Sequence, residues 1–173
     1  MPDTFRIIIT GKPRSGKSTL ALSLISELRL KGKWVSGILT PEIIKNKEMT
    51  GFRIIDIASD ETKVLASVDG KGPRIGNYYV NLEELDYITQ KFIDHSESAD
   101  VIIIDEIGKM EMLSEKFRNM VEKVFVMNKP VIAVVNMEMM EQYSGAGTVF
   151  TIDEESNIEK IKEKILIDMK IKD

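Results

Sequence analysis

The segment GKPRSGKST, residues 11–19, constrains the fold of this chain more than any other stretch. It follows the apolar run FRIIIT (5–10), which is typical of a buried strand. It leads into residues 18–30, where leucines and an isoleucine recur at helical spacing. The sequence therefore predicts a strand, a tight glycine-containing loop and a helix in direct succession.

The loop fits the pattern G-x-x-x-x-G-K-[ST] at Gly11, Gly16, Lys17 and Ser18. Glycines allow the backbone to approach a polyphosphate closely, with successive N–H groups pointing at the anion, and the helix that follows adds its positive N-terminal end. In this pattern the lysine reaches the β- and γ-phosphates and the serine hydroxyl coordinates Mg²⁺. The alternative is a glycine turn with a solvated lysine, but the flanking strand and helix favour the phosphate-binding interpretation.

Five further residues complete the predicted nucleotide-binding segment: Lys12, Pro13, Arg14, Ser15 and Thr19. Lys12 and Arg14 occupy variable positions of the pattern. They either add positive potential for a triphosphate or are solvated on the outer rim of the loop, and we favour the second interpretation.

Beyond the loop, strand-like and helix-like patterns alternate along the chain. Strands are predicted at 34–40, 101–105, 131–135 and 148–152, and helices at 81–96, 114–127, 137–143 and from about 156. The β-rich runs 51–57 and 62–67 predict a hairpin, and the Gly- and Pro-rich segment 68–77 predicts a loop. Such alternation predicts an α/β fold with a mostly parallel sheet and helices on both faces.

Composition narrows the class of protein. The 173 residues suit one domain, 1–173, because we find no repeat or linker. The absence of cysteine excludes disulfides and thiolate metal sites. With no signal-like N-terminus and no apolar run long enough for a membrane span, we expect a cytoplasmic protein without a membrane partner. A net charge of −4 does not indicate nucleic-acid binding, although a local basic patch stays open.

A second motif, VIIIDE (101–106), supplies acidic groups. The apolar strand brings Asp105 to its carboxyl end, where open α/β sheets bind ligands and where a carboxylate can hold Mg²⁺. Glu106 follows directly, and a carboxylate there can orient and polarise an attacking water. In the alternative interpretation Glu106 caps the next turn or pairs with Lys109. We favour the catalytic role.

Together with the loop, the run DEIGKME (105–111) resembles the thermophilic and cancer-related nucleoside-triphosphatases. The segments SGILTPE (36–42), Gly51-Phe52 and RIGNYYVN (74–81) are similar to motifs of that family in the same order. The resemblance implies a three-layer P-loop NTPase fold with an inserted β-hairpin, of the group that carries an additional catalytic glutamate. It also implies slow, Mg²⁺-dependent hydrolysis of ATP, GTP and other nucleoside triphosphates.

The resemblance places the nucleotide on two segments of the chain. The first is the loop with Gly11, Gly16, Lys17 and Ser18. The second comprises Ile102, Ile103, Ile104, Asp105, Glu106, Ile107, Gly108 and Lys109. Lys109 either contacts phosphate or nucleobase, or pairs with Glu106 or Glu111.

The chain departs from the family in its basic residues. Arg14 and Ser15 interrupt a loop that is commonly rich in Pro and Gly, and no Lys or Arg occurs from residue 130 through 159. An arginine often stabilises the transition state of phosphoryl transfer. Of the candidates Arg53, Arg74 and Arg118, we select Arg74 as catalytic, because its Gly-rich loop can swing over a site. The alternative, in which Arg74 binds a carboxylate within its own loop, has equal weight.

Three functions remain in competition. The first is hydrolysis of nucleoside triphosphates, with Lys17 and Glu106 as catalytic residues and Mg²⁺ held by Ser18 and Asp105. The second is a P-loop kinase for a small-molecule or polynucleotide acceptor, which usually carries an arginine-rich lid. The third is a nucleotide-gated binding protein that hydrolysis resets. The sequence identifies no protein partner.

Overall fold

The structure is a computed structural model, and it describes residues 6–170. The strands are β1 (Arg6–Gly11), β2 (Val35–Leu39), β3 (Glu42–Lys45), β4 (Glu48–Asp56), β5 (Thr62–Ser67), β6 (Arg74–Ile75), β7 (Tyr78–Val80), β8 (Val101–Ile107), β9 (Val131–Val135) and β10 (Thr148–Ile152). The α-helices are α1 (Lys17–Leu30), α2 (Leu82–His95), α3 (Glu115–Val124), α4 (Met140–Tyr143) and α5 (Ile158–Asp168). Short 3₁₀ turns are η2 (Ser96–Ser98), η3 (Glu111–Leu113) and η4 (Met137–Met139). Phe5, with which the first strand was predicted to begin, lies outside the described residues.

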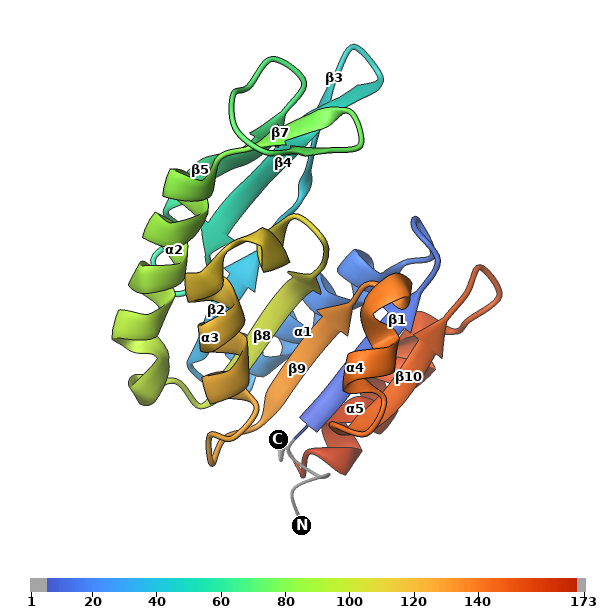
Figure 1. The fold of residues 1–173 in the computed structure, drawn as a ribbon. Coiled ribbons are helices and arrows are strands. Elements are labelled where there is room, and N and C mark those ends of the chain that lie inside the picture. Colours follow the sequence, from blue (N-terminus) through green and yellow to red (C-terminus); the bar gives the residue numbers. More distant parts are fainter. Residues whose placement is uncertain (1–5, 171–173) are drawn as a thin grey trace.

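The ten strands join in one sheet with the order β10-β1-β9-β8-β2-β4-β5-β7-β6, and β3 pairs with β4. The five strands from β10 to β2 are parallel, whereas β4 and the strands beyond it pair antiparallel. Figure 1 shows this antiparallel part extending beyond the carboxyl ends of the parallel strands. The predicted α/β fold with a parallel sheet is confirmed, and the inserted hairpin belongs to a larger antiparallel extension.

Helices cover both faces of the sheet, so the molecule has three layers (Figure 1). One core lies between the sheet and α2, α3 and α4, and the other lies between the sheet and α1 and α5. Alternate residues of one strand enter different cores: Ile102 and Ile104 face the first, and Ile103 faces the second. Because both faces are covered, the parallel strands read as continuous apolar runs.

Helix starts agree with the capping residues of the sequence. The Asn81 side chain accepts a hydrogen bond from the Glu84 N–H, and Ser114 accepts one from the Phe117 N–H. The helix after Ser114 ends at Val124, three residues before its predicted end. Residues after Val124 instead form hydrogen-bonded turns that lead into β9. In the described part of the chain, no helix combines the length and apolar character of a membrane span.

Gly37 allows close contact between β2 and β8, the strand that carries the acidic motif. Its φ is 145°, and a Cβ there would lie 1.8 Å from the Ile103 carbonyl oxygen. Any side chain at this position must therefore push the two strands apart, against a paired register that continues to Leu39 and Asp105.

We expect Gly37→Ala to lower the free energy of unfolding by about 3 kcal/mol or more, because it combines backbone strain with overpacking. Urea unfolding followed by circular dichroism measures this change. Gly145→Ala is the control, since a Cβ at Gly145 meets nothing within 4 Å. Equal stability of the two variants would contradict the predicted clash.

Candidate active site

The loop between β1 and α1 leaves the start of α1 available to an anion. Gly16 precedes the helix at φ 105°, and no side chain caps the first turn, which also lacks acidic residues. By contrast, α2 has an asparagine cap and two glutamates in its first turn. The first N–H groups of α1 therefore have no helical acceptor, and together with the helix dipole they form a site suited to phosphate.

Contact with β10 holds the base of the loop. Gly11 has φ 150°, and a Cβ there would lie 2.2 Å from the Ile152 carbonyl oxygen. The Lys17 ammonium folds back over the loop and donates to the Gly11 carbonyl at 2.7 Å. The loop and its lysine thus form a compact cradle at the carboxyl edge of the sheet, where Figure 1 shows the loop projecting beyond the strand ends.

A cavity of about 380 Å³ brings the two sequence motifs together. Its lining from the phosphate loop and α1 comprises Arg14, Gly16, Lys17, Ser18 and Thr19. Its lining from the strand ends and the extension comprises Thr40, Pro41, Glu42, Phe52, Asp105 and Glu106. The strands β1 and β8 are separated by β9 in the sheet, yet both end at this cavity. We call it the phosphate cavity.

Asp105 lies at the inner wall of the phosphate cavity, where it is 8% exposed. Burial, and next the charge of Glu106, raise the pKa of Asp105 to about 6, while a hydrogen bond with Ser18 and the charge of Lys17 oppose the rise. Ser18 and Lys17 offset only part of the cost of burying the negative charge of Asp105, so a cation beside this carboxylate is favourable. The Asp105 carboxylate and the Ser18 hydroxyl are oxygen ligands of the kind that Mg²⁺ prefers.

These two ligands suit a cation that a substrate helps to hold. Among the residues that the structure describes, no group of three or more His, Cys, Asp or Glu residues could hold a metal ion alone. Mg²⁺ is commonly bound by one or two protein oxygens together with substrate phosphates and water. The donor set of Ser18 and Asp105 therefore fits this mode of binding.

Glu106 presents a carboxylate that has room for a ligand. Its Oε2 atom is buried and has no hydrogen-bond partner. Burial raises the pKa of Glu106, the charge of Lys17 lowers it, and the charge of Glu42 raises it. The peptide bond between Asp105 and Glu106 is cis. An unpaired carboxylate oxygen in a phosphate-binding cavity is suited to accept a proton from a water molecule.

Thr40, at the end of β2, holds the backbone next to Glu106. The Glu106 N–H donates to Thr40 Oγ1 at 3.1 Å, and the Thr40 N–H donates to the Asp105 carbonyl. Thr40 Oγ1 is also 3.1 Å from the Asp105 carbonyl oxygen and 3.0 Å from Glu111 Oε2. One hydroxyl proton can serve only one of these two acceptors well, so a protonated Glu111 that donates to Thr40 satisfies the whole set.

Glu111 is therefore best described as a neutral acid. It is 5% exposed, and burial, followed by the charge of Glu106, raises its pKa to about 8. Gly108 lets it approach the site, because a Cβ on Gly108 would lie 3.0 Å from Glu111 Oε1 and 3.4 Å from Glu106 Cγ. Glu111 thus supports the backbone of Glu106 through Thr40 without adding a third negative charge.

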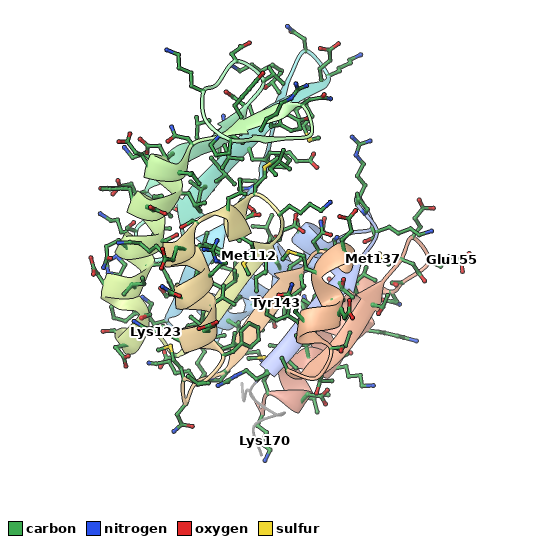
Figure 2. All side chains as sticks on the ribbon, in the orientation of Figure 1. Met112, Lys123, Met137, Tyr143, Glu155 and Lys170 are labelled. Atoms are coloured by element: carbon green, nitrogen blue, oxygen red, sulfur yellow. The ribbon has the colours of Figure 1, made fainter. Side chains whose placement is uncertain are left out.

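A second cavity, of about 470 Å³, lies on the other side of the phosphate loop. Its lining from the loop comprises Gly11, Lys12, Pro13 and Ser15. The opposite lining comprises Met137, Thr151, Ile152, Asp153, Glu154 and Glu155. Figure 2 labels Met137 near the end of β9 and Glu155 on the loop after β10. With the phosphate cavity, this space accounts for every residue of the predicted loop segment 11–19.

The second predicted segment contributes less than its length suggests. The side chains of Ile102, Ile103, Ile104 and Ile107 lie in the hydrophobic cores, so only the end of β8 reaches the phosphate cavity. Gly108 and Lys109 line a third, smaller cavity of about 220 Å³ on the other side of Glu106. Lys109 forms an ion pair with Glu138 rather than with Glu106 or Glu111.

The structure places Arg74 on β6, in the antiparallel extension. Its Nε atom donates to the Gly76 carbonyl at 2.8 Å, and its guanidinium lies 5.8 Å from the centre of the Tyr79 ring. Arg74 does not line the phosphate cavity, and its recorded partners include no carboxylate. Its predicted catalytic role stays a prediction.

Sequence reasoning assigned no role to Thr40, Pro41, Glu42 and Phe52 of the phosphate cavity, and it considered Glu111 only as a partner of Lys109. Thr40 ends a predicted parallel strand and Glu42 lies two residues beyond it, and the carboxyl ends of such strands form ligand sites. That signal was available in the sequence. Phe52 comes from the antiparallel extension, whose position relative to the loop depends on tertiary packing.

Comparison with known proteins agrees with this geometry. A family model described as NTPase matches residues 6–166. The chain belongs to the NTPase family. Nucleoside-triphosphatase THEP1 of Methanosarcina acetivorans is 38% identical over 165 residues, covering 92% of this chain and 94% of the relative. THEP1 of Methanocaldococcus jannaschii is 38% identical over 162 residues, covering 93% and 95%.

Solved structures support the fold of this NTPase-family chain. The crystal structure of THEP1 from Aquifex aeolicus is 30% identical, with a TM-score of 0.76, and covers 94% of this chain and 97% of that one. The solution structure of a human cancer-related nucleoside triphosphatase is 22% identical, with a TM-score of 0.77, and covers 97% and 99%. At that identity the human protein shows a shared fold. The expected P-loop NTPase architecture and family membership are thus confirmed.

Titration of Glu111 yields a testable pH dependence. The folded state holds a proton that the unfolded chain releases above its ordinary pKa of about 4.5. The free energy of unfolding therefore falls as the pH rises from about 5 to about 8. We expect Glu111→Gln, which stays neutral and can still donate to Thr40, to reduce this loss by a few kcal/mol.

Urea unfolding at several pH values between about 5 and 8, without nucleotide, measures the effect. Glu48→Gln is the control, because Glu48 is an exposed glutamate on β4. Parallel pH curves for the wild type and Glu111→Gln would contradict a neutral Glu111 in the folded protein.

Proposed function

We propose that the protein hydrolyses nucleoside triphosphates, ATP and GTP among them, to the diphosphate and inorganic phosphate in the phosphate cavity. The single observation that carries this proposal is the unpaired, buried Oε2 atom of Glu106 beside Lys17 and the uncapped start of α1. Membership of the NTPase family supports hydrolysis, and the relatives described above are named as triphosphatases.

The phosphate loop and Lys17 bind and orient the triphosphate. The N–H groups at the start of α1 donate hydrogen bonds to the negative phosphate oxygens, and Lys17 exchanges its contact with the Gly11 carbonyl for the terminal phosphates. The N–H groups are in place before the substrate arrives, so little reorganisation of the backbone is needed when charge develops on the phosphoryl group.

Glu106 acts on the water. Its Oε2 atom accepts a proton from a water molecule, whose oxygen then attacks the terminal phosphorus as the bond to the bridging oxygen breaks. The electron pair of that bond leaves with the nucleoside diphosphate. The raised pKa of Glu106 makes the carboxylate a stronger base, and the Thr40 hydrogen bond to its N–H fixes its position.

We also propose that Mg²⁺ participates, held by Ser18 and Asp105 together with the substrate phosphates. A bound Mg²⁺ would neutralise negative charge on the phosphates during transfer. The fit of these two oxygen donors, described above, supports the assignment.

The nucleoside end of the substrate fits the 470 Å³ cavity, which adjoins the same loop. Met137 offers an apolar surface for a base, and Asp153, Glu154 and Glu155 offer acceptors for the amino groups of adenine and guanine. These features support ATP and GTP as substrates.

The continuous sheet supports our proposal that residues 1–173 form one domain. The lack of cysteine fits our proposal of a cytoplasmic location.

Hydrolysis and the kinase alternative differ in their need for an acceptor, and the triphosphatase relatives give the kinase alternative no support. We expect release of phosphate from ATP and GTP with Mg²⁺ and no added acceptor, because water is the nucleophile. Glu106→Gln should lower turnover about 10²- to 10⁴-fold with nucleotide still bound. Lys17→Ala should weaken both binding and turnover, since its charge contacts the phosphates.

A phosphate-release assay with ATP, GTP, CTP and UTP, with and without Mg²⁺, tests the proposal. Lys123→Ala, on an exposed position of α3, controls for loss of a positive charge. Bound nucleotide without phosphate release would refute hydrolysis by the isolated protein. A partner captured only with triphosphate would add the switch function to the hydrolase.

A further inference from the structure

Negative charge spreads over the three outer oxygens of the phosphoryl group during transfer, and an arginine commonly stabilises it. The chain has six arginines, all within the described residues: Arg6, Arg14, Arg29, Arg53, Arg74 and Arg118. An arginine in this role must reach the phosphate cavity.

Four of the six are bound to backbone carbonyls elsewhere. Arg6 donates to the carbonyls of residues 125, 127 and 129, and Arg29 donates to that of residue 57. Arg74 donates to the carbonyl of residue 76, and Arg118 donates to that of residue 112. Arg53 is exposed on β4 and does not line the phosphate cavity. None of these five lines the phosphate cavity, and Arg14 is the arginine that does.

Arg14 lines the phosphate cavity together with Lys17, Asp105 and Glu106. It is exposed, and within residues 6–170 its side chain has no recorded hydrogen bond or ion pair. The guanidinium is thus free to turn toward a ligand. The loop pattern leaves this position variable, and the sequence alone favours a solvated Arg14 on the outer rim.

Charge balance in the cavity also favours a role for Arg14. Three carboxyl groups line it, those of Glu42, Asp105 and Glu106, and Lys17 and Arg14 are its two basic residues. Without Arg14, a strongly negative triphosphate would enter beside three acids with one lysine to offset them. A second fixed cation reduces this repulsion most where the terminal phosphoryl group approaches Glu106.

The backbone of Arg14 is strained. Its φ is 62°, in the left-handed region that a glycine adopts without steric cost. An arginine at such a position costs stability that glycine would restore. Five non-glycine residues within residues 6–170 have a positive φ, and Arg14 is the one among them that lines the phosphate cavity. Such strain is retained at active sites where the side chain is needed.

We propose that Arg14 is a catalytic residue, and that its guanidinium contacts the transferring phosphoryl group and stabilises the charge that develops there. This inference rests on the proposed hydrolase function. The arginine comes from the phosphate loop itself, so hydrolysis needs no arginine from the antiparallel extension or from a partner.

The test is a comparison of Arg14→Gly, Arg14→Lys and Arg74→Ala, with Lys45→Ala as a control for an exposed positive charge on β3. For Arg14→Gly we expect turnover with Mg²⁺ and ATP to fall on the order of 10²- to 10³-fold. The affinity for ADP should change less than about threefold, since the contact forms mainly in the transition state. The melting temperature should be equal or about 2–4 °C higher, because glycine relieves the strain.

A further readout is binding of ADP with aluminium fluoride and Mg²⁺, which mimics the transferring phosphoryl group. We expect Arg14→Gly to lose this complex while it still binds ADP. Arg14→Lys should recover part of the turnover, since it restores the charge without the planar fork. If Arg14→Gly does not fold, Arg14→Ala, which keeps a side chain at the same φ, gives the same comparison.

Several outcomes would overturn the inference. Turnover of Arg14→Gly within about threefold of the wild type would remove Arg14 from the mechanism. A raised KM with unchanged turnover would restrict it to binding of the ground state. Loss of turnover in Arg74→Ala alone would assign the role to Arg74. If the wild type itself releases no phosphate, the hydrolase proposal fails and the role of Arg14 fails with it.

Discussion

Burial of three carboxyl groups around the end of β8 is the constraint on which the site depends. Asp105, Glu106 and Glu111 each have a pKa raised first by burial. Three negative charges so close together in a low-dielectric region would be costly. Each of the three carboxyl groups is accommodated in a different way. Glu111 keeps its proton, and Asp105 has Ser18 and Lys17 beside it. Glu106 keeps one carboxylate oxygen without a hydrogen-bond partner. The carboxylates of Asp105 and Glu106 line the phosphate cavity, where a cation and a phosphate group fit.

The parallel sheet brings these groups together from distant parts of the sequence. Gly11, Thr40 and Asp105 are far apart in the sequence, yet they lie at or near the carboxyl ends of β1, β2 and β8, which point the same way. Both faces of the strands are buried, so their polar atoms are satisfied by pairing and only the strand ends offer groups to a ligand. The antiparallel extension adds Phe52 to the rim of the same cavity.

Sequence patterns predicted the parts of this molecule in which local signals are strong. The phosphate loop, the apolar strand before Asp105 and the caps at Asn81 and Ser114 depend on neighbouring residues alone. The strands β3, β6 and β7 were missed because they contain two to four residues, too few for a periodic pattern. The role of Glu111 was missed because it arises from a contact with Thr40, a residue far from it in the sequence. For the same reason, spacing could not reveal that Arg14 lines the cavity and Arg74 does not.

The packing around Gly37 and Gly11 has a consequence for how proteins of this kind can diverge. Each of these positions faces a backbone carbonyl so closely that no side chain fits. Gly11 and Gly37, in the strands beneath the site, therefore cannot be replaced without disturbing the packing of the strands. Residues 12–14 of the loop above them are exposed. Evolution can alter the charge and reach of the loop without disturbing the strands that hold it. Changes at these loop positions can therefore alter the charge beside the phosphate cavity while the packing of the strands beneath it stays the same.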